Sequence, residues 1–317
     1  MGWRCPRLGE RQPGGVETSN FQISEPVIVS VCFPFVATPP VGDISGSRAS
    51  LGWADEASVP YANFAYNLRM PRILCVTAHP DDEAAAFGGS LRLYHERGAE
   101  IYVVCLTAGQ AGSHRGLAKT DHELAAIRRK EFAASCEILG IDRGVVLDYA
   151  DGQLHRVDLY KVVGDLIQHI REFRPDVMLT FGPEGGVTGH TDHSMASVFA
   201  TIAYQWAGRE NRYADQLLDG VTAHRTRKLY YATGNFVLAG RPPVSPPPIT
   251  TVIEIGDFVK TKIAAFETHT TQAPVFPLVR DTILSRGPEE YFHLAATTEP
   301  GSAARETDLF TGLSAKD

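Results

Sequence analysis

Apolar segments alternate with helix-like segments from residue 72 onward, and this alternation limits the fold more than any other feature of the chain. Continuous apolar runs predict strands that are buried on both faces, over residues 72–78, 100–109, 144–149 and 177–181. The segments between and after them predict helices over residues 82–98, 120–140, 158–176 and 193–208. Such repeats with short connections form a mostly parallel sheet with helices on both faces. We therefore expect an α/β fold of this kind.

The ends of the chain differ from this pattern. Residues 1–69 are rich in Gly, Pro and Ser and show no sustained periodicity, so we expect an irregular, low-complexity extension. Met70 stands just before the first predicted strand, and translation starting at Met70 is the alternative to a genuine extension. We expect the folded domain over residues 70–293 and a polar, flexible tail over residues 294–317.

Charge and cysteine content narrow the classes of partner. The net charge of −7 argues against binding to nucleic acid, and no apolar run approaches the roughly 18 residues of a membrane span. The five cysteines form no CxxC pair and are odd in number, which favours the reducing cytoplasm over a disulfide-forming compartment. We expect a small-molecule substrate, and the sequence leaves homo-oligomer formation open.

Two predicted strand ends carry clusters of imidazoles and carboxylates. "AHPDDE" follows the first strand, and "GHTDH" follows the fourth strand and its glycine-rich loop. In open parallel sheets, ligands bind beyond the carboxyl ends of the strands, so the two clusters are expected to share one site. Crowded carboxylates repel each other unless a cation or a proton intervenes. Either cluster alone would be typical of a solvated helix start, but the two together favour a metal site.

Two histidines and one carboxylate form a common three-ligand zinc set, with one position left open. We predict His79, Asp82 and His193 as the metal ligands. Asp81 lies beside a ligand without being needed as one, so it is predicted as the general base.

The remaining polar residues of the second cluster are given supporting roles. His190 is three residues before His193, so it could also be a metal ligand. If it is not, it is predicted to stabilise the developing oxyanion as a hydrogen-bond donor, and Asp192 is predicted to orient a neighbour. The other histidines are expected to be structural or on the surface, except that His269 could reach either the rim of the sheet or the core.

The motifs "AHPDDE", "LTAGQAG", "RRKEFAASCEILG", "RPDVMLTFGPEGGVTGHTDH" and "KTKIAAFETHTTQ" together resemble the PIG-L/LmbE-like deacetylase family, over residues 71–293. The resemblance implies a Rossmann-like fold and a divalent metal, usually Zn²⁺, with Fe²⁺ as an alternative. It also implies removal of an acyl group, often acetyl, from the nitrogen of an amino sugar such as N-acetylglucosamine. The metal ligands, general base and oxyanion-stabilising histidine of the family match the residues assigned above.

The chain departs from the family at two positions that border the substrate. Thr188 stands where some members have tyrosine, and Gln110 where many have glutamate. Arg115, in the loop after the second strand, is a candidate for gripping a substrate hydroxyl or acidic group. These three residues are our substrate-binding candidates.

Two other functions are weighed against deacetylation. An amidase of the same family would act on a thiol conjugate or a modified antibiotic. A nucleotide-binding protein without hydrolysis is the rival from another class, but the first strand is not followed by G-x-G-x-x-G, and the carboxylates there would repel a pyrophosphate.

Overall fold

The computed structural model describes residues 28–30, 70–218, 220–238, 241–299 and 305–313. Residues 1–69 were expected to be either a genuine extension or a segment upstream of a start at Met70. Apart from residues 28–30, this segment lies outside the described residues. None of the described helices is both long enough and apolar enough to cross a membrane.

An eight-stranded sheet forms the centre of the domain, in the order β1-β4-β3-β2-β5-β6-β8-β7. The strands are β1 (Ile28–Ser30), β2 (Arg72–Thr77), β3 (Glu100–Thr107), β4 (Arg143–Tyr149), β5 (Val177–Phe181), β6 (Lys228–Ala232), β7 (Thr251–Glu254) and β8 (Glu289–Thr297). Strands β2 to β6 pair in parallel, whereas β1, β7 and β8 pair antiparallel. The predicted mostly parallel α/β sheet is confirmed.

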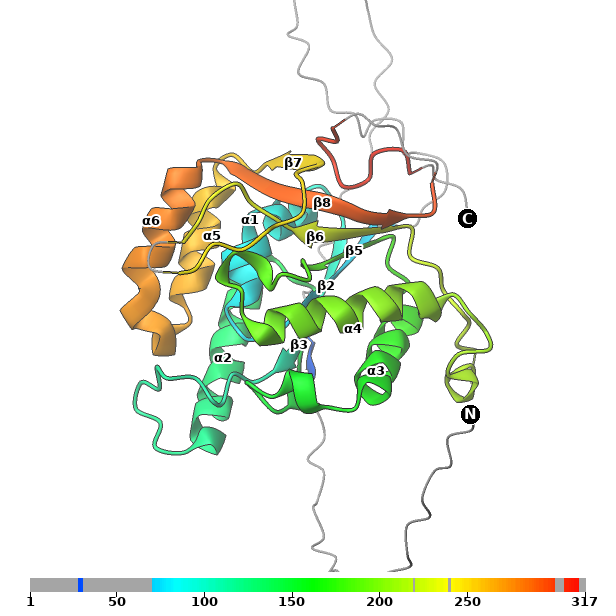
Figure 1. Ribbon diagram of the computed structural model, residues 1–317, viewed down its shortest axis with the longest axis horizontal. Coiled ribbons are helices and arrows are strands. Elements are labelled where there is room, and N and C mark those ends of the chain that lie inside the picture. The colour runs from blue at the N-terminus through cyan, green and yellow to red at the C-terminus, as the bar shows by residue number, and fades with distance from the viewer. Residues whose placement is uncertain (1–27, 31–69, 219, 239–240, 300–304, 314–317) are drawn as a thin grey trace, which may run out of the picture.

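Helices cover both faces of the sheet (Figure 1). They are α1 (Asp82–Glu96), α2 (Asp121–Leu139), α3 (Leu159–Phe173), α4 (Thr191–Ala207), α5 (Phe258–Glu267) and α6 (Phe276–Arg286). Helices α3 and α4 pack together on one face, and α1, α2 and α5 pack together on the other. The capping box at the start of α2 is present, with the Thr120 side chain accepting from the Glu123 amide.

The core follows from the apolar strands. Every residue of β5 is buried, and in β2 and β3 all residues after the first are buried, as expected for strands covered on both faces. The order of the strands reverses between β2 and β5, because the chain builds β3 and β4 on one side of β2 and then returns to its other side. Such a switch point is where open α/β sheets bind ligands.

The C-terminal part differs from the prediction. Helix α6 was not expected, and the domain boundary predicted at residue 293 falls inside β8. Residues 305–313 are not a free tail, since Leu309 is fully buried and Glu306 forms a bridge with Thr251. At the other end, β1 lies within the segment that was expected to be irregular, and its backbone pairs with β4.

Candidate active site

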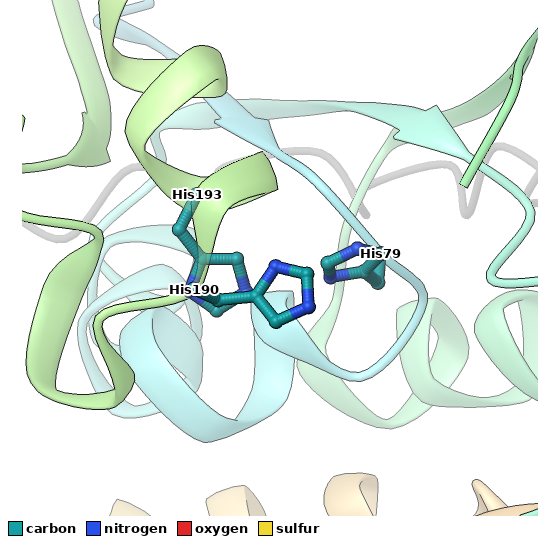
Figure 2. Close-up of side chains that lie close together, drawn as sticks. All are labelled: His79, His190 and His193. Atoms are coloured by element: carbon teal, nitrogen blue, oxygen red, sulfur yellow. The ribbon is translucent and has the colours of Figure 1, made fainter. Parts of the chain in front are cut away.

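The two predicted clusters meet at the switch point. His79 follows β2, and His190 and His193 stand at the start of α4, which follows β5. Because β2 and β5 are parallel neighbours, their carboxyl ends lie at one edge of the sheet. Figure 2 shows the imidazoles of His190 and His193 reaching from the start of α4 toward His79.

The glycine-rich loop after β5 places these two histidines. Gly185 has a φ of 90°, in the left-handed region that favours glycine. A Cβ atom at this position would lie 2.6 Å from the carbonyl oxygen of His190. The loop therefore needs glycine at residue 185 in order to pass this close to the first residues of α4.

The three imidazoles form one cluster. The ring centroid of His79 lies 4.9 Å from that of His190 and 5.3 Å from that of His193. One nitrogen of each ring lies within 4.8 Å of the others. The ring of His193 also stacks on Phe181, with centroids 4.1 Å apart, which fixes its plane.

Asp82 links two of these imidazoles. Its Oδ1 lies 3.2 Å from His193 Nε2, and its Oδ2 lies 3.6 Å from His79 Nδ1. The backbone amides of Ala78 and His79 donate to Oδ2. Burial alone would raise the pKa of Asp82, but the neighbouring imidazoles, His193 above all, hold it well below its ordinary value. The structure thus brings His79, Asp82 and His193 together with an ionised carboxylate between the rings.

Two further carboxylates face the other edge of His79. Its Nε2 lies 3.1 Å from Asp151 Oδ1 and 3.5 Å from Asp192 Oδ2. Asp192 is fully buried and accepts from the backbone amides of Gly152 and Leu154. His79, Asp151 and Asp192 form a second group whose ligand atoms lie within 4.8 Å of one another.

These donors suit a divalent cation. His79 Nε2 is buried and has no hydrogen bond of acceptable geometry to the described residues, although Asp151 is close. Burial alone would lower the pKa of His79, but the surrounding carboxylates, Asp151 first, raise it well above its ordinary value. A cation would offset this concentration of carboxylates, and imidazole and carboxylate are both ligands of such ions.

Asp81 lies beside the cluster in an unusual backbone conformation. Its φ of 117° is in the left-handed region, which costs a non-glycine residue on the order of 1–3 kcal/mol. Arg128 Nη2 lies 2.8 Å from the Asp81 carboxylate, and the backbone amide of Asp81 donates to Glu83 Oε2. Burial raises the pKa of Asp81 to about 6, against the opposing effect of the Arg128 guanidinium. A carboxyl group with this pKa can exchange a proton near neutral pH.

A buried hydrogen-bond network holds Glu83, the residue that accepts from the Asp81 amide. Glu83 Oε1 accepts hydrogen bonds from Ser135 Oγ at 2.6 Å and from His269 Nε2 at 2.8 Å. Both Glu83 and His269 are fully buried. The alternatives left open for His269 are thereby resolved, because the side chain lies in the core and contacts the residue that holds the Asp81 amide.

His190 is exposed to the cavity and begins α4. Its Nδ1 accepts from the Asp192 amide at 3.1 Å, so the neutral ring carries its proton on Nε2. Burial lowers the pKa of His190, and the neighbouring imidazoles of His79 and His193 lower it further. A neutral imidazole with a free Nε2–H is a hydrogen-bond donor.

A cavity of about 620 Å³ opens onto these groups. Its polar end is lined by His79, Asp81, Arg128, Asp151 and His190. This volume falls within the range of about 300–1,000 Å³ that is typical of small-molecule sites.

Of the three predicted substrate-binding residues, one lines the cavity and two do not. Thr188 lines the cavity, and its Oγ1 lies 3.2 Å from His193 Nδ1. Gln110 and Arg115 are not among the cavity-lining residues. The Gln110 amide donates to the carbonyl of Tyr149, and Arg115 pairs with Asp121 at 2.7 Å, so backbone and helix-start contacts hold them elsewhere.

Sequence reasoning missed Arg128 and Asp151. Asp151 follows the end of β4, and the rule that polar residues beyond parallel strands converge would have identified it. Arg128 lies within the helical pattern of α2, where nothing distinguishes it from a solvated arginine.

The family model described as GlcNAc-PI de-N-acetylase (PIG-L) matches residues 74–204. A diacetylchitobiose deacetylase of Thermococcus kodakarensis is 29% identical over 203 residues, covering 64% of this chain and 70% of the relative. A 1D-myo-inositol 2-acetamido-2-deoxy-alpha-D-glucopyranoside deacetylase of Catenulispora acidiphila is 30% identical, covering 76% of this chain and 97% of the relative.

A solved structure with the same fold carries a different activity in its name. The 4-carboxy-2-hydroxymuconate hydratase of Pseudomonas putida superposes with a TM-score of 0.60 at 21% identity, covering 74% of this chain and 99% of the hydratase. At this identity the likeness concerns the fold alone, so the reaction has to be argued from the site.

Proposed function

Because the chain belongs to the PIG-L family of N-acetylglucosaminyl deacetylases, we propose that it is a metal-dependent hydrolase that removes an N-acyl group, acetyl in the simplest case, from an amino sugar or its conjugate. The observation that carries the proposal is the position of Asp81, which faces the cavity beside the imidazole–carboxylate cluster with a pKa near 6. Amide hydrolysis needs such a group, because one residue must take a proton from water and later supply one to the leaving amine.

His79, Asp82 and His193 would hold the metal, and Asp151 and Asp192 would orient His79 from its other edge. Two imidazoles and one carboxylate favour zinc, and ferrous iron accepts the same kind of donor set. A divalent cation, when bound, polarises an acyl carbonyl and makes water more acidic.

The residues of the chain then divide the proton and charge transfers between them. Asp81 takes a proton from the attacking water as the new C–O bond forms. The Nε2–H of His190 donates to the acyl oxygen as negative charge develops there. Asp81 next delivers the proton to the amine nitrogen, the C–N bond breaks, and a carboxylic acid and an amine leave. Arg128, which contacts Asp81, would keep that carboxyl group in place between the two transfers.

The size of the cavity and the state of the cysteines bear on the substrate and on the cellular compartment. The substrate is a small molecule, in keeping with the size of the cavity. We infer a reducing compartment such as the cytoplasm, since Cys75, Cys105 and Cys136 are free and buried. Fractionation of cells that produce the tagged protein tests the compartment.

Metal analysis coupled to a substrate screen tests the function. The purified protein is assayed for bound metal and for release of acetate or a larger acid from N-acylated amino sugars and their conjugates. Release that stops with a chelator and returns with Zn²⁺ or Fe²⁺ supports the proposal, and the size of the acid separates a deacetylase from an amidase on larger conjugates. Absence of amide cleavage by the metal-loaded protein, together with hydration of an unsaturated acid, would refute it in favour of the reaction named for the fold relative.

A further inference from the structure

The cavity has a second end that the proposed chemistry does not use. Besides the groups assigned to the chemistry, its wall includes residues of α6, Val275 just before it, and Phe236, Leu238 and Arg241. Helix α6 lies on the outer side of α5 (Figure 1). An amino sugar with an acetyl group has many hydroxyls and little apolar surface, so it has no chemical counterpart for such a wall.

One face of α6 lines the cavity. Val279, Ile283 and Arg286 follow one another at intervals of three or four residues, so they project from the same side of the helix. Leu278 and Thr282 lie beside them on the cavity wall. The face is therefore apolar along most of its length and ends in a cation.

Arg286 has no carboxylate partner at ion-pair distance among the described residues. Its guanidinium lies over the rings of Phe236 and Tyr291, with its central carbon 4.6 Å and 5.5 Å from the two ring centroids. Its Nε is buried and lacks a hydrogen-bond partner within the described part of the chain. The guanidinium is partly buried and has no short-range counter-charge among the residues described, so its position at the wall of the cavity suits an anion from outside the protein.

The buried carboxylate of Glu290, on β8, is already engaged. Glu290 forms an ion pair with Lys262, and its oxygens also accept from the backbone amides of Gly89 and Ser90. Glu290 therefore influences Arg286 through space while its own hydrogen-bonding capacity is used elsewhere.

We propose that the α6 end of the cavity is a subsite for a carboxylate or similar oxyanion carried on an apolar part of the substrate, with Arg286 binding the anion and Val279, Ile283 and Phe236 contacting the apolar part. This inference rests on the proposed function and specifies its substrate as an acidic, apolar-substituted conjugate of an amino sugar. Arg286 determines specificity in this assignment and takes no part in the bond cleavage.

Binding of two matched probes tests the subsite without turnover. Biphenyl-4-carboxylate and the neutral biphenyl-4-carboxamide are titrated into the full-length protein, with and without chelator, and their affinities are measured by calorimetry. We expect the carboxylate to bind on the order of tenfold more tightly, and we expect this preference to persist after chelation. Equal affinities for the two probes, or a preference that disappears with the metal, would overturn the proposal without any variant.

Two variants of Arg286 and one control separate anion binding from stacking. Arg286→Met keeps the apolar stem against the rings and removes the charge, so the preference should fall to about one, whereas Arg286→Lys should keep part of it. Arg280→Met removes another α6 cation, one that pairs with Glu267 and does not line the cavity, and should leave the preference unchanged. An unchanged preference in a folded Arg286→Met protein would assign that arginine to stacking alone.

The outcome can be distinguished from failure of the proposed function. If the probes bind as expected but no amide is cleaved by the metal-loaded protein, the subsite stands and the hydrolase proposal fails. If N-acetylated amino sugars are cleaved while both probes bind equally, the hydrolase proposal stands and the subsite fails.

Discussion

Replacing Gly185 with alanine tests whether the glycine-rich loop positions His190 and His193, the histidines proposed for the active site. Gly185 has a φ of 90°, so the substitution costs roughly 1–2 kcal/mol in backbone strain alone. The new Cβ would also lie 2.6 Å from the His190 carbonyl oxygen, against an ordinary contact of at least 3.4 Å. The start of α4 must then retreat by about 0.8 Å, and a displacement near 1 Å at a catalytic group can lower the rate on the order of 100-fold.

Gly256→Ala is the matched control. Gly256 also has a positive φ, of 51°, but its Cβ would meet no atom within 4 Å. Both variants should therefore lose a similar amount of unfolding free energy through strain, measured by urea denaturation. Only Gly185→Ala should also lose bound metal and most of its kcat/KM. A Gly185→Ala protein with the metal content and activity of the control would show that the loop does not place His190 and His193.

Four further predictions rest on the described contacts. Asp81→Asn should retain metal but lose about 10²–10⁴-fold in kcat/KM, since the base is removed and the ligands stay; full activity would exclude this role. His193→Ala should lose metal and activity together, and elemental analysis showing full metal content would contradict its assignment as a ligand. Lys262→Met should cost about 3–5 kcal/mol of unfolding free energy, because it leaves the Glu290 carboxylate buried without its cation; adding Glu290→Gln should recover part of the loss. Burial alone would raise the pKa of Glu290, but Lys262 lowers it. The ion pair should therefore stabilise the wild type fully above about pH 4.3, the ordinary pKa of glutamate, and less as the pH falls below that value. Denaturation at several pH values measures this loss.

The sequence predicted the central part of the fold because its signals there are strong. The apolar runs before His79 and Gly182 are long enough to identify buried parallel strands, and the capping box at Thr120 marks the start of α2. Helix α6 was missed because its exposed Leu278 and Leu284 disturb the separation of apolar and polar faces that identifies a helix. Strand β8 was missed because it pairs antiparallel, outside the repeating strand–helix pattern.

The candidate site was predictable mainly where residues cluster in the sequence. His79, Asp82 and His193 belong to two dense motifs, and the structure brings them together. Arg128 stands alone in the sequence and is distinguished only by the neighbours that folding gives it, whereas Asp151 follows the end of β4, where its place could have been predicted. Gln110 and Arg115 follow a strand that points at the site, but local hydrogen bonds turn their side chains away.

The groups assigned to the chemistry and the apolar wall of the cavity come from different parts of the chain. The groups assigned to the chemistry come from residues 79–193, at the ends of the parallel strands, whereas the apolar wall of the cavity comes from residues 236–286, near the antiparallel edge. On the proposed assignment, mutations in α6 would change the class of conjugate that binds while the reacting centre stays intact. Exchange of α6 between related chains would be a practical route to enzymes of altered selectivity.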